Sequence, residues 1–178
     1  MLIWFNHPSI ANLISVIPQQ PQEIGCNFFY KKRFTHHIAV YDPRTILSIN
    51  KDTKNTKNTK TTFWTRNGAR FDSYNQVCVP LRLNPQCSGT LAIALAIFFL
   101  KAKHITIVGC GWHKKDTTSL FDDYYTHNKS LDKGSNTKLA LLRTYQKEFN
   151  IKLRFVSDTT LDPAFEHETV EGLLKRLA

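Results

Sequence analysis

Short runs of β-branched and aromatic residues recur along the chain and constrain its fold more than any other feature. Most of these runs show little alternation between apolar and polar positions, which is typical of strands buried on both faces of a sheet. We expect strands at 2–5, 24–29, 37–41, 62–65, 77–81, 105–108 and 153–156. The pattern therefore predicts an α/β fold with a mostly parallel sheet and helices on both faces.

Capping residues predict where several helices begin. Asp42 and Asp162 each precede a proline, so a carboxylate can cap the free amides while the proline takes the first helical position near 43 and 163. Ser88 is a similar cap for a buried helix over 90–101. Segments 136–149 and 170–177 carry apolar residues at helical spacing, which predicts amphipathic helices that cover the sheet.

Length and hydropathy set the broad class of the protein. The 178 residues suit a single domain spanning 1–178. The longest apolar run, 91–100, is about half of what a membrane-spanning helix needs, and the first residues lack the basic segment of a signal peptide. We therefore expect a cytoplasmic protein without a membrane span. The four cysteines lack zinc-site spacing, so we expect reduced thiols on or near the core.

The net charge of +10 favours an anionic partner. Residues 1–70 carry 10 basic and 3 acidic side chains, so most of the excess lies in the first part of the chain. Nucleotide phosphate, a sugar acid and nucleic acid are all candidates, and so is a basic surface with no specific partner.

Two polar segments are candidates for loops. Residues 51–62 (KDTKNTKNTKTT) contain a tandem repeat with no apolar residue, which predicts a flexible basic loop. This loop could be a flap over a phosphate or a tolerated surface insertion. Asn67 and Gly68 predict a tight turn. Residues 113–135 show no strong helix or strand pattern and are a candidate active-site lid.

Polar residues follow several of the predicted strands. Asn6 and Ser9 come after the first strand, Asn27 lies late in the second apolar run, and Asp42 follows the third. In an open parallel sheet, ligands bind beyond the carboxyl ends of the strands, so these residues are candidates for ligand contacts. Ser9 and Asp42 are equally explained as helix caps.

Small residues form a second group of candidates. Ser88 and Gly89 stand at a predicted helix start, where backbone amides can bind an anion. Gly109 and Gly111 follow the strand 105–108 and would let a ligand approach the backbone, although tight packing explains them equally well. His127, in the candidate lid, could act as a general acid or base or be a structural histidine.

Seven segments, taken in order, resemble the sialyltransferase-like glycosyltransferases and the related pterin diphosphokinase-like (MptE-like) group. The likeness lies in a strand-to-helix turn, a polar strand end, a glycine-containing helix start followed by a strand, and a tyrosine-histidine motif. The segments are NHPSI (6–10), GCNFFY (25–30), AVYDP (39–43), KTTFW (60–64), CSGTLAIALAIFFLKAKHITIVGCGW (87–112), YYTH (124–127) and NIKLRFVS (150–157).

This resemblance implies a Rossmann-like domain that binds a cytidine nucleotide sugar and transfers the sugar, with sialic acid as one candidate, to an acceptor hydroxyl without a metal or other cofactor. By position, the pocket would be lined by Asn6, Ser9, Asn27, Asp42, Ser88 and Gly109, with Gly89 and Gly111 beside them. His127 would be the acid or base, and Tyr124 and Tyr125 would donate hydrogen bonds to the departing phosphate.

The chain departs from the family pattern at three positions. His7 stands where the family turn has glycine, and Gly111 stands where bacterial members place an acidic residue. An ungapped alignment of the following helix puts the family histidine near Lys133.

Two other functions stay open. One is a pyrophosphokinase-like transfer to a pterin, with Mg²⁺ held by Asp42, Asp122 and Asp123. The other is a non-catalytic module that binds a nucleotide, or binds nucleic acid through the basic stretches 31–33 and 51–60.

Overall fold

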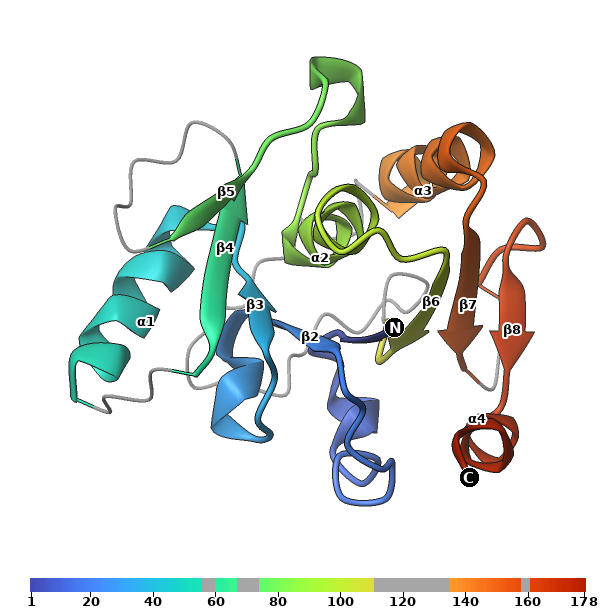
Figure 1. Ribbon diagram of the computed structural model, residues 1–178, viewed down its shortest axis with the longest axis horizontal. Coiled ribbons are helices and arrows are strands. Elements are labelled where there is room, and N and C mark those ends of the chain that lie inside the picture. Colours follow the sequence, from blue (N-terminus) through green and yellow to red (C-terminus); the bar gives the residue numbers. More distant parts are fainter. Residues whose placement is uncertain (56–59, 67–73, 111–134, 158–160) are drawn as a thin grey trace.

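Eight parallel strands form one sheet at the centre of the computed structural model, which describes residues 1–55, 60–66, 74–110, 135–157 and 161–178 (Figure 1). The strands are β1 Leu2–Trp4, β2 Glu23–Cys26, β3 His37–Ala39, β4 Thr62–Arg66, β5 Asn75–Val77, β6 His104–Val108, β7 Lys152–Val156 and β8 Glu166–Glu168. The Rossmann-like α/β fold with a mostly parallel sheet is confirmed. β8 was not predicted, because its sequence is polar and contains no apolar run.

The order of the strands reverses at β1. The sheet runs β5-β4-β3-β2-β1-β6-β7-β8, so β1 lies between β2 and β6. Leu2 pairs with Glu23 on one side and with Thr106 on the other. In a parallel sheet of this kind, the connections diverge at the reversal and leave a crevice beyond the carboxyl ends of the two central strands.

Helices cover both faces of the sheet, as predicted. α2 (Ser88–Phe98) and α3 (Ser135–Phe149) lie together on one face (Figure 1), where they pack on alternate strand residues such as Ile3 and Phe155. α2 is buried over most of its length, as its uniformly apolar sequence predicts.

The opposite face is covered by α1 (Pro43–Asn55), α4 (Val170–Leu177) and two 3₁₀ helices, η1 (Pro8–Ile10) and η2 (Asn27–Lys31). A third 3₁₀ helix, η3 (Leu81–Leu83), contacts α3. Trp4, fully buried on this face, stacks on Phe29 with 5.1 Å between ring centroids. The amphipathic pattern predicted for 170–177 is confirmed, with Leu173 buried.

The predicted cap at Ser88 is wrong. α2 begins at Ser88 itself and ends at Phe98, and Cys87 occupies the capping position. The hydroxyl of Thr90 accepts hydrogen bonds from the backbone amides of Gln86 and Cys87 at 2.8 and 3.0 Å. Thr90 therefore provides the acceptor for the two amides just before the helix. The Ser88 hydroxyl is left available for contacts outside the helix.

The two Asp-Pro signals have different outcomes. Asp42 accepts a hydrogen bond from the Arg44 amide at 2.7 Å and begins α1, as predicted. The helix predicted near 163 is absent from the described residues 161–169, because Asp162 instead accepts from the Ala164 amide in a turn that leads into β8. α4 begins later, capped by the hydroxyl of Thr169.

The predicted basic loop at 51–62 is wrong at both of its ends. α1 continues to Asn55, and Thr62 begins β4. Residues 56–59, the turn at Asn67 and Gly68, and positions 113–134 of the candidate lid lie outside the described residues, while the predicted lid end at Ser135 begins α3. Across the ranges that the structure covers, no helix has the length and hydropathy needed to cross a membrane.

Candidate functional site

Residues from five segments gather at the carboxyl edge of the sheet. Asn6 follows β1, Asn27 directly follows β2, and Gly109 directly follows β6. Tyr41 follows β3, and its amide contacts Ser88 at the start of α2. We call Asn6, Asn27, Tyr41, Ser88 and Gly109 the rim site. Because β1 pairs with both β2 and β6, the rim site lies at the point where the strand order reverses.

The ends of β1 and β6 are held together at Gly109. The amide of Phe5 donates to Val108 O at 2.8 Å, and the amide of His7 donates to Gly109 O at 3.3 Å. Gly109 has a φ of +79°, and an added Cβ would overlap Ile10 and lie 3.0 Å from the carbonyl oxygen of Phe5. A glycine is therefore required for the two strand ends to approach each other.

A hydrogen-bond chain links Asn27, Ser88 and Tyr41. The Ser88 hydroxyl donates to Asn27 Oδ1 at 2.6 Å and accepts from the Tyr41 amide at 3.0 Å. Asn27 has a φ of +53°, a left-handed conformation that asparagine tolerates better than most residues. Since Oδ1 accepts from Ser88, the amide nitrogen is the part of Asn27 that can donate to a ligand.

Asn6 differs from the other polar residues of the rim site. Both Oδ1 and Nδ2 are buried, and neither has a hydrogen-bond partner among the described residues. Leaving a buried amide without a partner costs about 1–3 kcal/mol, so such groups are rare in folded proteins unless a ligand or water completes them. A polar ligand beside Asn6 could therefore supply the missing hydrogen bonds to its carboxamide.

Gly89 has a clear packing role. A Cβ at this position would lie 2.5 Å from Cζ of Phe5, so the glycine lets the start of α2 pack against the end of β1. This contact brings the free amides of the helix start to the rim site, where they favour negative charge. Direct contact of Gly89 with a ligand stays a prediction.

Asp42 and Ser9 are less informative. Asp42 is exposed, and one of its carboxylate oxygens caps α1, which supports the capping interpretation. Ser9 belongs to η1, and its side chain is outside what the structure describes. Ligand contacts by either residue stay predictions.

The predicted catalytic residues lie outside the described residues. This applies to Tyr124, Tyr125 and His127, and also to Gly111. Of the three carboxylates considered for Mg²⁺, only Asp42 is in the described part of the chain. Within that part, no group of three His, Cys, Asp or Glu side chains could hold a metal ion.

Part of the basic cluster 31–33 is buried. Arg33 Nη2 lies 2.8 Å from Glu23 Oε1, and its side chain is only 8% exposed. The other guanidinium nitrogens of Arg33 donate to Glu23 and to the carbonyl oxygens of Ile14 and Ile17. Arg33 therefore cannot contribute to a nucleic-acid surface, which corrects that part of the expectation.

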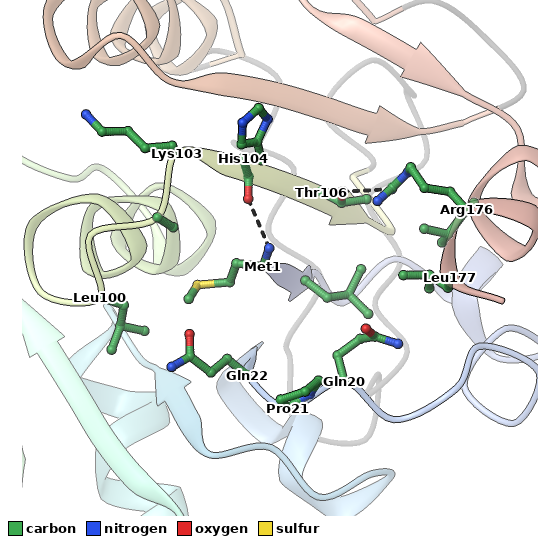
Figure 2. Close-up of a pocket in the computed structure, with 13 residues that line it drawn as sticks. Met1, Gln20, Pro21, Gln22, Leu100, Lys103, His104, Thr106, Arg176 and Leu177 are labelled. Carbon is green, nitrogen blue, oxygen red and sulfur yellow. Dashed lines mark hydrogen bonds between the residues drawn. The ribbon is translucent and has the colours of Figure 1, made fainter.

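A cavity of about 430 Å³ lies at the opposite edge of the sheet, by the amino ends of β1 and β6. Figure 2 shows Gln20, Pro21 and Gln22 on one side and His104 and Thr106 on the other. Two of its cations are already engaged. Arg176 donates to Thr106 Oγ1 and pairs with Glu168, and Lys103 donates to the carbonyl oxygen of Phe149. This cavity is separate from the predicted crevice.

Comparison with known proteins shows one shared fold. No protein-family model and no curated protein matches the chain. A crystal structure of the sialyltransferase CST-II in complex with a trisaccharide acceptor and CMP is similar, with a TM-score of 0.65 and 17% sequence identity. The match covers 97% of this chain and 86% of that chain. At this identity, the likeness shows a shared fold.

Proposed function

We propose that this protein is a sialyltransferase-like glycosyltransferase that binds a cytidine nucleotide sugar at the rim site and transfers the sugar to an acceptor hydroxyl. The observation that carries the proposal is the buried Asn6 amide, which has no partner in the described structure and lies where the strand order reverses. The fold is also shared with a sialyltransferase crystallised with CMP and an acceptor.

The rim site offers groups suited to a nucleotide. The amides of Asn6 and Asn27 can exchange hydrogen bonds with a base edge or with ribose hydroxyls. The first turn of α2 presents backbone amides and a positive dipole end, which suit a phosphate. The rim site therefore combines neutral hydrogen-bonding side chains with a helix N-terminus that attracts an anion.

The proposed reaction is an in-line displacement at the anomeric carbon. The acceptor hydroxyl oxygen forms the new bond while the bond to the nucleotide phosphate breaks, and the acceptor proton passes to a base. We assign that role to His127. Tyr124 and Tyr125 are proposed to donate hydrogen bonds to the phosphate as negative charge develops on it.

A thermal-unfolding panel with cytidine, uridine, guanosine and adenosine nucleotides, each with and without Mg²⁺, tests the binding step. A ligand at one hundred times its Kd stabilises the native state by about 2.7 kcal/mol. We expect CMP to raise Tm most, without a Mg²⁺ requirement, and N6A to lose that increase. Equal responses to all four nucleotides would contradict the proposal.

A non-catalytic nucleotide-binding protein is the second candidate. It is favoured by the sequence departures at Gly111 and Lys133, which lie where the family places an acidic residue and its histidine. Release of CMP from CMP-sialic acid in the presence of acceptor separates the two. If the wild type transfers the sugar and H127A binds CMP without transferring it, the enzyme is supported. If the wild type binds CMP and shows no turnover, the second candidate is supported.

A further inference from the structure

A cationic side chain lies directly beside the rim site. Arg66 is the last residue of β4, and the register of β3 with β4 pairs Ala39 with Trp64. Tyr41 lies two residues beyond Ala39, just after the end of β3, and Arg66 lies two residues beyond Trp64, so the two are neighbours. The Arg66 guanidinium carbon lies 5.1 Å from the centroid of the Tyr41 ring, within the range of a cation-π interaction.

Arg66 is connected to the start of α2 through Tyr41. The Tyr41 amide donates to Ser88 Oγ at 3.0 Å, and Ser88 donates to Asn27. Tyr41 also packs against the core cluster that contains α2. Tyr41 therefore contacts Arg66 through its ring and the first residue of α2 through its backbone amide, so an anion near Tyr41 would be attracted by both the guanidinium and the positive end of the helix.

Among the described residues, no carboxylate forms an ion pair with Arg66, although most other arginines have such a partner. The Nε of Arg66 is buried, and no described residue accepts a hydrogen bond from it. Five other arginines pair with a carboxylate in the structure: Arg33, Arg82, Arg143, Arg154 and Arg176. A buried nitrogen on a charged group is costly when it is left without an acceptor, which indicates that a ligand supplies one.

We propose that Arg66 binds an oxyanion of the ligand at the rim site and that Tyr41 positions its guanidinium. This inference rests on the proposed function and adds the requirement that the ligand carries a negative oxygen group near Tyr41. A guanidinium binds phosphate and carboxylate oxygens through two parallel hydrogen bonds. The group can be the nucleotide phosphate or a carboxylate on the transferred sugar.

Affinities of wild type and R66Q for cytidine, CMP and CMP-sialic acid test the proposal. We expect R66Q to weaken binding of the oxyanion-bearing ligand about ten-fold or more and to leave cytidine unchanged. Loss with CMP identifies the phosphate, and loss only with CMP-sialic acid identifies the carboxylate. R82Q is the matched control, because Arg82 is 68% exposed and pairs with Glu148 on the last turn of α3.

Equal affinities of R66Q and wild type for CMP and CMP-sialic acid would overturn the role of Arg66 while the proposed function stands. Equal weakening of all three ligands, cytidine included, would also overturn it, since a structural defect would act in that way. If wild type binds neither CMP nor CMP-sialic acid, the proposed function and this inference both fail.

Two further variants test the positioning role. Y41L removes the aromatic ring and should weaken only the ligand that R66Q weakens, and Y41F, which keeps the ring, should weaken it less than Y41L does. The salt dependence of that ligand's affinity should fall in Y41L, because the cationic contact is lost. Unchanged affinity and unchanged salt dependence in Y41L would overturn the role of Tyr41.

Discussion

Ser88 and Asn27, 61 residues apart in the chain, share a hydrogen bond of 2.6 Å that joins the first turn of α2 to the end of β2. Ser88 is 9% exposed, so this contact is largely protected from water. We expect S88A to lower the free energy of unfolding by about 1–2 kcal/mol, because Asn27 and the Tyr41 amide both lose a partner.

Urea unfolding of S88A measures this effect, with T144A as the control. The Thr144 hydroxyl is exposed and donates only to the carbonyl oxygen of Ala140 in its own helix. We expect T144A to change stability by less than about 0.5 kcal/mol. Equal losses of unfolding free energy in S88A and T144A would show that the hydrogen bond between Ser88 and Asn27 makes no specific contribution to stability.

Asn6 should contribute to binding and not to stability. Because its buried carboxamide has no partner in the described structure, N6A should leave the free energy of unfolding unchanged or raise it by about 1 kcal/mol. The same variant should weaken CMP binding about ten-fold or more. Paired unfolding and calorimetric titrations measure both quantities.

N27A provides the contrast to N6A. Asn27 accepts from Ser88 and has a positive φ, so its replacement should lower both stability and nucleotide affinity. A loss of stability in N6A as large as that in N27A would contradict the assignment of Asn6 as a binding group.

Gly109 should tolerate no side chain. Its φ is +79°, and a Cβ added there would lie 3.0 Å from the Phe5 carbonyl oxygen, so G109A should lose about 2 kcal/mol or more of stability. The control is G172A in α4, where a Cβ would make ordinary contacts and alanine favours the helix by up to about 1 kcal/mol. Thermal and urea unfolding compare the two.

His37 predicts a pH dependence of stability. Burial, reinforced by the nearby His36, lowers the pKa of His37 below its usual value of 6.5. Its Nδ1 also accepts a hydrogen bond from Trp64 Nε1 at 3.2 Å, which requires the neutral ring. The unfolded chain therefore binds a proton at a higher pH than the native protein, and this part of the stability is lost as the pH falls below about 6.5.

Urea unfolding of wild type and H37Q between pH 5 and pH 8 isolates this contribution. Glutamine can accept from Trp64 through its amide oxygen but does not titrate. We expect a smaller fall in stability toward pH 5 in H37Q than in wild type. The same pH dependence in both proteins would assign it to other groups.

The central strands could be predicted from sequence because their burial on both faces demands continuous apolar runs. β8 could not, since Glu166 and Glu168 are charged and owe their place to pairing with Arg154 and Arg176 at the edge of the sheet. The Asp-Pro signal at Asp162 was ambiguous for a physical reason, because a side-chain cap stabilises a turn as well as a helix.

The candidate site shows the same division. The ends of the strands can be read from the sequence, so Asn6, Asn27 and Gly109 could be placed at one edge. The partner of Ser88 depends on where α2 packs, and that is a tertiary property. Arg66 directly follows the predicted strand 62–65 and is the last residue of β4, so a charged residue at that position is the signal that would have found it.

The position of β1 also bears on how the chain assembles. β2 to β5 can join the sheet one after another as the polypeptide emerges, but the second edge of β1 stays open until β6 arrives about a hundred residues later. The entropy cost of closing a loop rises only slowly with its length, but pairing between strands so far apart in the sequence slows folding. Nascent chains that stop before β6 would therefore expose a bare central strand, a natural target for chaperones.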